Sequence, residues 1–260
     1  MGVMQKTIIV VPCFNESQRL VPGEFKKAVT EYPWLHFLFV NDGSTDNTRE
    51  ILEFLCNSFS PQLERIHLER NSGKAEAVRQ GFLIAFRIDA DYIGYWDADL
   101  ATPLDVIPRF CEILEEPGMK MVIGARVRLL GRKIERRRLR HYLGRIFATC
   151  ASMLIKLPIY DTQCGAKIFK NTEELRMVFS TPFTVRWTFD VEILARLLLA
   201  ERTLGATPLI ESGVEYPLEN WKDITGSKVR TVDFIVAFIE LARIYLFLRF
   251  PKIEKTSPGS

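Results

Sequence analysis

Short apolar segments that end in clusters of polar residues recur five times in the first 126 residues, and helix-like segments separate them. This alternation is typical of an α/β domain with a mixed, mostly parallel sheet flanked by helices. Ligands of an open parallel sheet bind beyond the carboxyl ends of its strands, so the sequence predicts a site at that edge. The predicted strands are 7–11, 37–40, 65–68, 92–96 and 121–123, and the polar clusters after them are 12–16, 41–46, 71–74, 97–99 and 124–126.

Apolar residues at three-and-four spacing predict the helices of the chain. The predicted helices are 45–57, 74–88, 103–115, 138–157, 189–200 and a C-terminal amphipathic helix at 229–253, with further strands at 167–169 and 207–216. The composition of residues 254–260 is typical of a disordered tail.

Two carboxylates, Asp97 and Asp99, follow the apolar segment 92–96 directly. Oxygen ligands at this spacing suit a hard divalent cation, Mg²⁺ or Mn²⁺, that also binds phosphate oxygens. The alternative is a solvated turn, which the same two residues would also form.

Asp42 is a second candidate ligand, because a carboxylate at a strand end accepts a hydrogen bond from the imino N–H of uracil or guanine. An Asp-Gly turn followed by helix-capping residues explains the same segment without a ligand. Lys74, at the start of a predicted helix, favours an anion nearby. Neither a phosphate-binding G-x-x-x-x-G-K-[ST] loop nor a dinucleotide-binding G-x-G-x-x-G motif is present.

Positive charge is concentrated between Arg126 and Arg145, where nine Lys and Arg residues stand with one acidic residue. This segment carries a net charge of +8 in a chain of net charge +3, which predicts an anionic partner. A nucleic-acid-binding protein is the alternative outside the enzymes. No aromatic residue is interleaved with the basic ones between 126 and 140, which argues against that class.

The segment 232–250 is the most lipid-like of the chain, but it contains four charged residues, which argues against a membrane-spanning helix. Five cysteines without a C-x-x-C pair predict a reducing compartment. We therefore expect a cytoplasmic protein that is peripheral at the cytoplasmic face of a membrane. A homo-oligomer through the C-terminal helix is also compatible with the sequence.

Seven motifs follow one another along the chain, namely Val11–Glu16, Val40–Asp46, Asn71–Lys74, Trp96–Asp99, Asp161–Phe169, Arg186–Glu192 and Trp221 with 226–228. The first four together resemble the signature motifs of the family 2 inverting glycosyltransferases. The last three resemble those of the dolichyl-phosphate and polyprenyl-phosphate glucosyltransferase branch of that family. The chain departs from the usual pattern at Ala75, where relatives carry a glycine.

The resemblance implies a GT-A glycosyltransferase fold over residues 1–228, with a nucleotide-sugar half (1–125) and an acceptor half (126–228). It also implies a nucleotide-diphospho-sugar donor, with UDP-glucose favoured, and a polyprenyl or dolichyl phosphate acceptor. Its residue assignments are Pro12, Asn15, Glu16, Asp42, Lys74 and Asp97 to the nucleotide, Asp97 and Asp99 to the metal, Asp190, Asp99 and Arg126 to catalysis, and Arg136, Arg137, Arg138, Arg140 and Lys228 to the acceptor phosphate. We also expect Gln163 and Trp187 at the sugar cleft, where Trp187 would either stack on a sugar ring or simply form part of the wall.

A hydroxyl acceptor in polysaccharide or glycoconjugate synthesis is the alternative within the family. Asp190 would then act as general base, whereas an anionic lipid phosphate needs little help from a base. Processive relatives carry a Q-x-x-R-W motif; this chain has Arg186 and Trp187 but Phe183 in place of glutamine, which favours single transfers.

Overall fold

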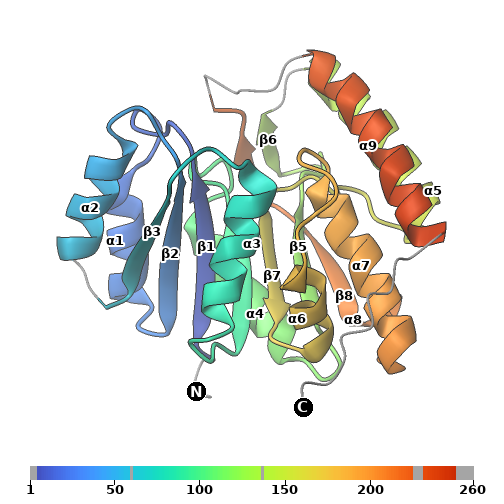
Figure 1. The fold of residues 1–260 in the computed structure, drawn as a ribbon, viewed down its shortest axis with the longest axis horizontal. Coiled ribbons are helices and arrows are strands. Elements are labelled where there is room, and N and C mark those ends of the chain that lie inside the picture. Colours follow the sequence, from blue (N-terminus) through green and yellow to red (C-terminus); the bar gives the residue numbers. More distant parts are fainter. Residues whose placement is uncertain (1–4, 59–60, 136–137, 225–230, 250–260) are drawn as a thin grey trace.

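A seven-stranded sheet in the order β3-β2-β1-β4-β7-β5-β8 forms the centre of the computed structural model, which describes residues 5–58, 61–135, 138–224 and 231–249 (Figure 1). The strands of this sheet run parallel to one another except β7, which pairs antiparallel with both β4 and β5. The predicted mixed, mostly parallel sheet is confirmed. The strands are β1 (Thr7–Cys13), β2 (Leu35–Asp42), β3 (Leu63–Leu68), β4 (Tyr92–Trp96), β5 (Met121–Ala125), β7 (Ala166–Lys170) and β8 (Gly213–Pro217).

Helices cover both faces of the sheet, so the inner strands are apolar on both sides. Ile8 and Val10 of β1 belong to one core cluster with α3, α6 and α7, and Ile9 and Val11 to a second with α1, α2 and α4. The helices are α1 (Pro22–Glu31), α2 (Thr48–Ser58), α3 (Lys74–Ala85), a 3₁₀ turn at Leu104–Val106, α4 (Ile107–Glu115), α5 (Arg138–Ile155), α6 (Glu173–Ser180), α7 (Phe189–Leu204), α8 (Leu209–Ser212) and α9 (Thr231–Arg249).

The C-terminal part of the fold differs in detail from the sequence prediction. A strand over 207–216 is wrong for its first half, where the short helix α8 precedes β8. Pro208 begins this helical turn, and the Leu209 N–H donates to the Glu201 carboxylate at 2.8 Å instead of to a neighbouring strand. Helices α1 and α6 were not predicted.

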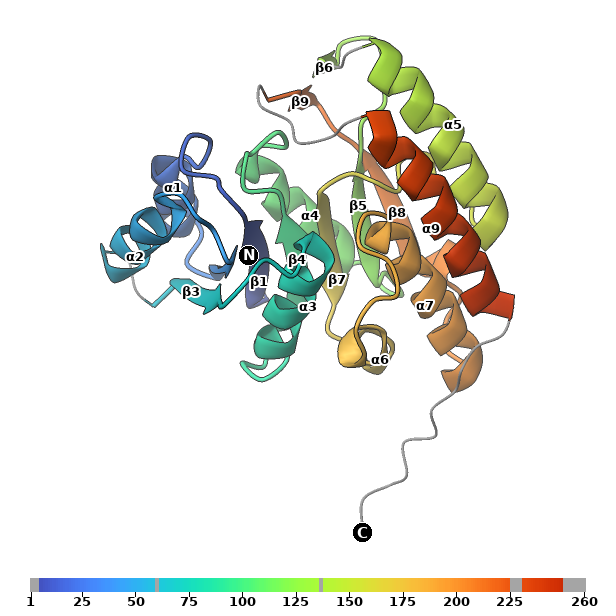
Figure 2. The same ribbon diagram turned by 45° about the horizontal axis from the view of Figure 1, so that its top comes forward.

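Helices α5 and α9 lie side by side at one end of the sheet (Figures 1 and 2). The rings of Phe147 on α5 and Phe238 on α9 are 6.0 Å apart. Nearby, β6 (Lys133–Glu135) and β9 (Asn220–Lys222) form a small parallel sheet. Among the described residues, no helix combines the length and the apolar character that a membrane span requires. The ends of the helix predicted at 229–253 lie outside the described residues.

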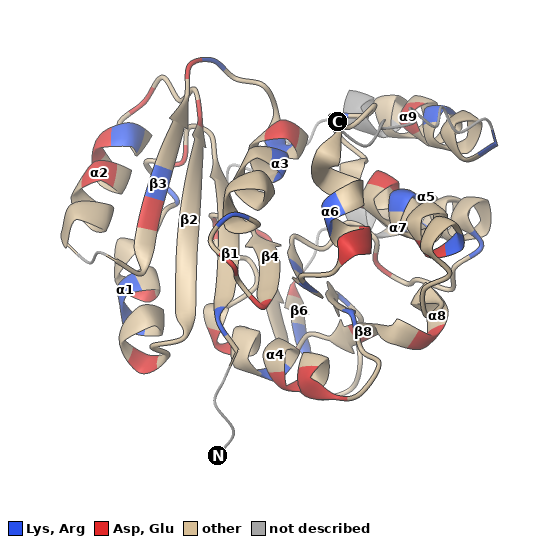
Figure 3. Ribbon diagram, turned by 60° about the horizontal axis from the view of Figure 1, so that its bottom comes forward, with Lys and Arg blue, Asp and Glu red and all other residues tan. Residues whose placement is uncertain are grey.

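Charged residues lie mainly on the outer helices and on the edge strand β3, whereas β2 is free of them along most of its length (Figure 3). Some charged side chains are nevertheless buried in the interior, and several of them belong to helices. Those near the predicted site are Glu16, Asp42, Asp161, Lys167 and Asp190.

Candidate active site

The loops after β1 and β2 are joined by hydrogen bonds at the carboxyl edge of the sheet. The Asn15 N–H donates to the Ser44 hydroxyl at 3.0 Å, and the Asn15 side-chain oxygen accepts from the Thr45 N–H at 2.8 Å. The Glu16 N–H donates to the Thr48 hydroxyl at 2.8 Å. These contacts fix the shape of the loop pair that the family resemblance assigns to the nucleoside, and that assignment stays a prediction.

Asp42 ties this loop pair to the next one. Its side chain is buried, and its two oxygens accept from the Ser72 N–H at 2.7 Å and the Gly73 N–H at 2.8 Å. The carboxylate therefore sets the backbone in front of α3. Pro12 is half-buried in β1, opposite Val40 of β2.

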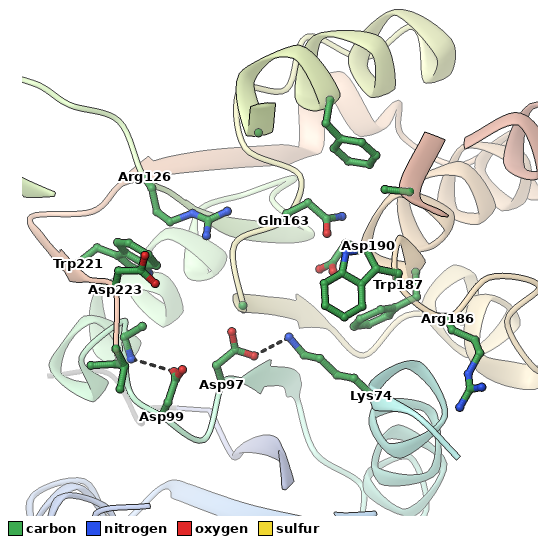
Figure 4. Close-up of a pocket in the computed structure, with 17 residues that line it drawn as sticks. Lys74, Asp97, Asp99, Arg126, Gln163, Arg186, Trp187, Asp190, Trp221 and Asp223 are labelled. Atoms are coloured by element: carbon green, nitrogen blue, oxygen red, sulfur yellow. Dashed lines mark hydrogen bonds and ion pairs between the residues drawn. The ribbon is translucent and has the colours of Figure 1, made fainter. Parts of the chain in front are cut away.

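Lys74, at the start of α3, meets the carboxylates that follow β4. Its Nζ is 2.5 Å from Asp97 Oδ1, an ion pair visible in Figure 4. Burial opposes the charged amine, but the charges of Asp97 and Asp190 outweigh it and raise the pKa of Lys74. Asp99 Oδ1 accepts from the Ala101 N–H at 3.2 Å, and Arg19 lies 3.9 Å from its Oδ2. Burial, and then the charge of Asp97, raise the pKa of Asp99 from 3.8 to about 6.

Gly165 leaves room for the Asp97 side chain. The Asp97 N–H donates to the Gly165 carbonyl at 2.9 Å, and the Asp97 carboxylate rests against the glycine itself. A Cβ at position 165 would lie 1.9 Å from Asp97 Oδ2, which no real contact allows. The absent side chain therefore forms part of the carboxylate site.

Asp190 is held in place by side chains from two strands. Tyr95 of β4 and Lys167 of β7 face each other across the sheet, and both donate to Oδ1 of Asp190, which stands in the first turn of α7. Lys167 is fully buried and also donates to the Cys164 carbonyl at 2.6 Å. Burial and the charge of Asp190 raise the pKa of Tyr95, which keeps its hydroxyl protonated as a donor.

Arg126 forms the opposite wall. Its guanidinium donates to both oxygens of Asp161, at 2.6 and 2.7 Å, and stands 5.2 Å from the centre of the Trp221 ring. Burial works against the charge, but Asp161 raises the pKa of Arg126. A planar fork of this kind is one that a lysine cannot reproduce.

A cavity of about 270 Å³ lies between these groups (Figure 4). Seven predicted site residues line it, namely Lys74, Asp97, Asp99, Arg126, Gln163, Trp187 and Asp190. Pro12, Asn15, Glu16 and Asp42 stand in or after β1 and β2, at the carboxyl edge of the same sheet, and do not line this cavity. Gln163 Nε2 is buried and has no hydrogen-bond partner within the described residues, so it is a donor open to a ligand.

The predicted acceptor-phosphate cluster falls largely outside the described residues. Arg136, Arg137 and Lys228 belong to the ranges that are not described. Arg138 and Arg140 lie in the first turn of α5, but their side chains are not described either. The assignment of these residues stays a prediction.

Some residues at the cavity were not singled out from the sequence. Asp223 after β9, Arg186 before α7 and Ala237 of α9 line it, although Figure 4 shows the Arg186 side chain directed away from the other labelled groups. Lys167 was part of a motif without a role of its own. Its position within an apolar strand could have indicated its role, because a lysine buried there needs a carboxylate partner.

Asp97 and Asp99 fit a divalent cation by the chemistry of their oxygen donors and by their mutual charge, which a cation would offset. Among the described residues, no group of three or more Asp, Glu, His or Cys side chains gathers around a common point. The two carboxylates would therefore need further oxygen ligands from a bound phosphate or from water to complete the coordination.

Comparison with known proteins yields consistent matches. The model of glycosyl transferase family 2 matches residues 8–176. A dolichyl-phosphate beta-glucosyltransferase of Trichomonas vaginalis is 32% identical, with 94% of this chain and 72% of that protein covered. The dolichyl-phosphate beta-glucosyltransferase of Homo sapiens is 30% identical, over 93% of this chain and 74% of that protein.

Among solved structures, glucosyl-3-phosphoglycerate synthase from Mycobacterium tuberculosis in complex with Mn²⁺, UDP and glucosyl-3-phosphoglycerate superposes with a TM-score of 0.63. The identity is 16%, over 94% of this chain and 80% of that one, so this likeness concerns the fold.

Proposed function

Since the chain belongs to glycosyl transferase family 2, among the dolichyl-phosphate beta-glucosyltransferases, we propose that it transfers glucose from UDP-glucose to dolichyl phosphate or a similar polyprenyl phosphate. The observation that supports this most is the convergence of three groups on one cavity. Lys74, the Asp97 and Asp99 pair, and Asp190 come from separate motifs, and each suits a different part of the donor.

On the donor side, the leaving group is a nucleoside diphosphate whose negative charge grows as the bond to C1 breaks. A divalent cation, Mg²⁺ or Mn²⁺, held by Asp97 and Asp99 would supply positive charge to this diphosphate. Lys74 stands 2.5 Å from Asp97 and can reach a phosphate oxygen with a small side-chain movement. The loops around Asn15 and Asp42 would receive the uridine.

On the sugar side, Asp190 is held rigid by Tyr95 and Lys167 through Oδ1. No hydrogen bond from a described residue is found on Oδ2, which leaves that oxygen to orient a sugar hydroxyl or to stabilise positive charge at C1. Gln163 Nε2 is a second group open to the sugar.

The acceptor phosphate is already anionic at neutral pH, so its oxygen attacks C1 without transferring a proton. Attack opposite the leaving group inverts the anomeric centre and gives the beta linkage that the relatives' names state. Arg126 lies on the wall opposite Lys74, where a phosphate arriving from that side would meet it.

We place the lipid chain along α5 and α9. Phe147 of α5 and Ala237 of α9 line the cavity, so both helices reach the site. Their outer faces expose large apolar side chains, which suits a peripheral contact with the membrane. These are Tyr142, Ile146 and Met153 of α5, and Ile235, Val236, Phe238, Ile239, Tyr245 and Leu246 of α9.

The test is glucose transfer by the purified chain with Mn²⁺ or Mg²⁺, labelled nucleotide sugars and a polyprenyl phosphate in detergent or liposomes. We expect a chloroform-extractable glucolipid with UDP-glucose, which disappears with chelator and in Asp99→Ala. Label that moves only to water-soluble hydroxyl acceptors would contradict the lipid acceptor. Label that moves from GDP-sugars alone would contradict the donor.

A further inference from the structure

Glu240 is a buried carboxylate on α9, with 4% of its surface exposed. It accepts from three successive backbone N–H groups, those of Arg186 at 3.0 Å, Trp187 at 3.0 Å and Thr188 at 2.8 Å. The Thr188 hydroxyl adds a further bond at 3.0 Å. Within the part of the chain that the structure describes, no lysine or arginine pairs with it, so hydrogen bonds alone compensate its burial.

These bonds serve the segment that leads into α7. The start of a helix carries unsatisfied N–H groups and partial positive charge, which an acidic group stabilises. Thr188 occupies the N-cap position of α7, yet its side chain caps no N–H of the helix and donates to Glu240 instead. The carboxylate that accepts from the Thr188 N–H is thus supplied by another helix, more than fifty residues later in the chain, in addition to the acidic residues of the first turn of α7 itself.

The segment that Glu240 binds, residues 186–188, carries or adjoins side chains of the candidate active site. Trp187 lines the cavity with 38% of its surface exposed, and Asp190 stands two residues beyond Thr188. Figure 4 places Trp187 and Asp190 on the same side of the cavity, across from Arg126. Ala237, one helical turn before Glu240, lines the cavity as well. One turn of α9 therefore contributes Ala237 to the cavity wall and, through Glu240, binds the segment that carries Trp187.

We propose that Glu240 is a positioning residue of the transferase, which holds Trp187 and the first turn of α7 so that Asp190 meets the donor sugar. The inference rests on the proposed function and deepens it. It makes α9 a component of the catalytic unit, in addition to any contact that the outer face of α9 makes.

A second buried carboxylate allows positioning to be separated from mere stability. Glu192 of α7 accepts from the Thr184 and Val185 N–H groups at 2.9 to 3.0 Å and pairs with Arg196 at 2.7 Å. It thus holds the preceding part of the same segment, but neither Thr184 nor Val185 lines the cavity. Loss of this carboxylate should reduce stability without moving Trp187.

The experiment compares Glu240→Gln, Glu240→Asp, Glu192→Gln and the exposed α9 variant Arg243→Gln in the full-length chain. Glutamine has the size of glutamate but replaces one of the two acceptor oxygens with an NH₂ group, which then faces the N–H of Arg186 or that of Thr188. We expect kcat with UDP-glucose to fall about 100-fold in Glu240→Gln, the effect of a displacement of roughly 1 Å, while KM changes less. Glu240→Asp should recover part of the activity, and Arg243→Gln should retain all of it.

Tryptophan fluorescence supplies a readout that does not require turnover. We expect addition of UDP and Mn²⁺ to change the emission of the wild type, and Trp187→Phe to identify the part of that change due to Trp187. Glu240→Gln should lose this part, and Glu192→Gln should keep it despite a lower melting temperature.

Unchanged kcat and fluorescence in Glu240→Gln would overturn the inference. The inference would also be overturned if Glu240→Gln and Glu192→Gln lowered the melting temperature by the same amount and lost kcat to the same extent. The loss of activity would then follow from lower stability, whichever carboxylate is removed. If the wild type transfers no glucose, the proposed function fails, and the fluorescence comparison still decides whether Glu240 positions Trp187.

Discussion

Replacement of Gly165 by alanine tests the carboxylate site with one methyl group. Gly165 is not among the residues with positive φ, so alanine is compatible with its backbone. The added Cβ would lie 1.9 Å from Asp97 Oδ2 and 2.2 Å from Asp97 Cγ, whereas ordinary contacts of a Cβ begin at 3.4 Å. The Asp97 carboxylate must therefore move by about 1.5 Å, away from the place where Lys74 meets it.

A movement of this size has different effects on activity and on stability. Misplacement of a reacting or binding group by roughly 1 Å costs about 100-fold in rate, so we expect at least that loss of glucose transfer in Gly165→Ala. Overpacking costs about 1–3 kcal/mol, and the smaller entropy of the unfolded alanine chain offsets about 0.4–1 kcal/mol of it. The melting temperature should therefore fall by no more than about 10 °C, and the protein stays folded during the assay.

The assay is the chloroform-extractable glucolipid formed at saturating UDP-glucose, with melting curves on the same samples. Gly23→Ala is the matched control, since a Cβ at Gly23 meets nothing within 4 Å and the residue lacks a positive φ. In an Asp97→Ala background, Gly165→Ala should cause no further loss of activity, because the clashing atoms are gone. Gly165→Ala with activity within threefold of the wild type would refute the role given to Asp97.

Three further outcomes follow from the same contacts. Hydrogen bonds from Ser17 and Thr48 outweigh burial and lower the pKa of Asp46 from 3.8 to about 2. Because the pKa of Asp46 is lower in the folded state, its carboxylate stabilises the protein fully above pH 4, and this stabilisation is lost as the pH falls toward 2. In urea unfolding, Asp46→Asn should be less stable than the wild type by about 2 kcal/mol at pH 7 and by about 1 kcal/mol at pH 3. Mn²⁺ and UDP together should raise the melting temperature by about 5–10 °C, more than the sum of their separate effects, and Asp99→Asn should remove the excess. Lys167→Met leaves Asp190 buried without its cation and should cost about 3–5 kcal/mol in denaturant unfolding, whereas adding Asp190→Asn should restore most of the stability and none of the activity.

The strands and the edge that carries the site could be predicted because they depend on local patterns. Strands covered on both faces are apolar throughout, as in Tyr92–Trp96, and the polar residues that follow mark their ends. Helix α6 was missed although its start carries ordinary signals, a Thr172 N-cap and the acidic pair Glu173 and Glu174. Its eight residues are too few for a clear apolar repeat.

The contacts between distant segments could not be predicted from such patterns. Tyr95, Lys167 and Asp190 meet because β7 enters the sheet antiparallel, between β4 and β5, in a register that sets Lys167 opposite Tyr95. Hydrophobic periodicity identifies a strand but not its neighbours or its register. The hydrogen bonds that the segment before α7 donates to Glu240 depend in the same way on how α9 packs against α7.

Four cationic side chains at this edge already have carboxylate partners within the protein, and this pairing constrains the ligand. Lys74 pairs with Asp97, Arg126 with Asp161 and Lys167 with Asp190, and Arg19 contacts Glu16 and lies 3.9 Å from Asp99. A diphosphate that enters such a site finds little unpaired positive charge, and it also takes Lys74 away from Asp97 if it binds that amine. The carboxylates left behind then favour a second cation, so binding of the diphosphate and of a divalent cation should be coupled. The coupling is reciprocal, so each of Mn²⁺ and UDP should tighten the binding of the other by the same factor. Equal affinity for UDP with and without Mn²⁺ would mean that the pairs stay intact and that the protein's own cations suffice.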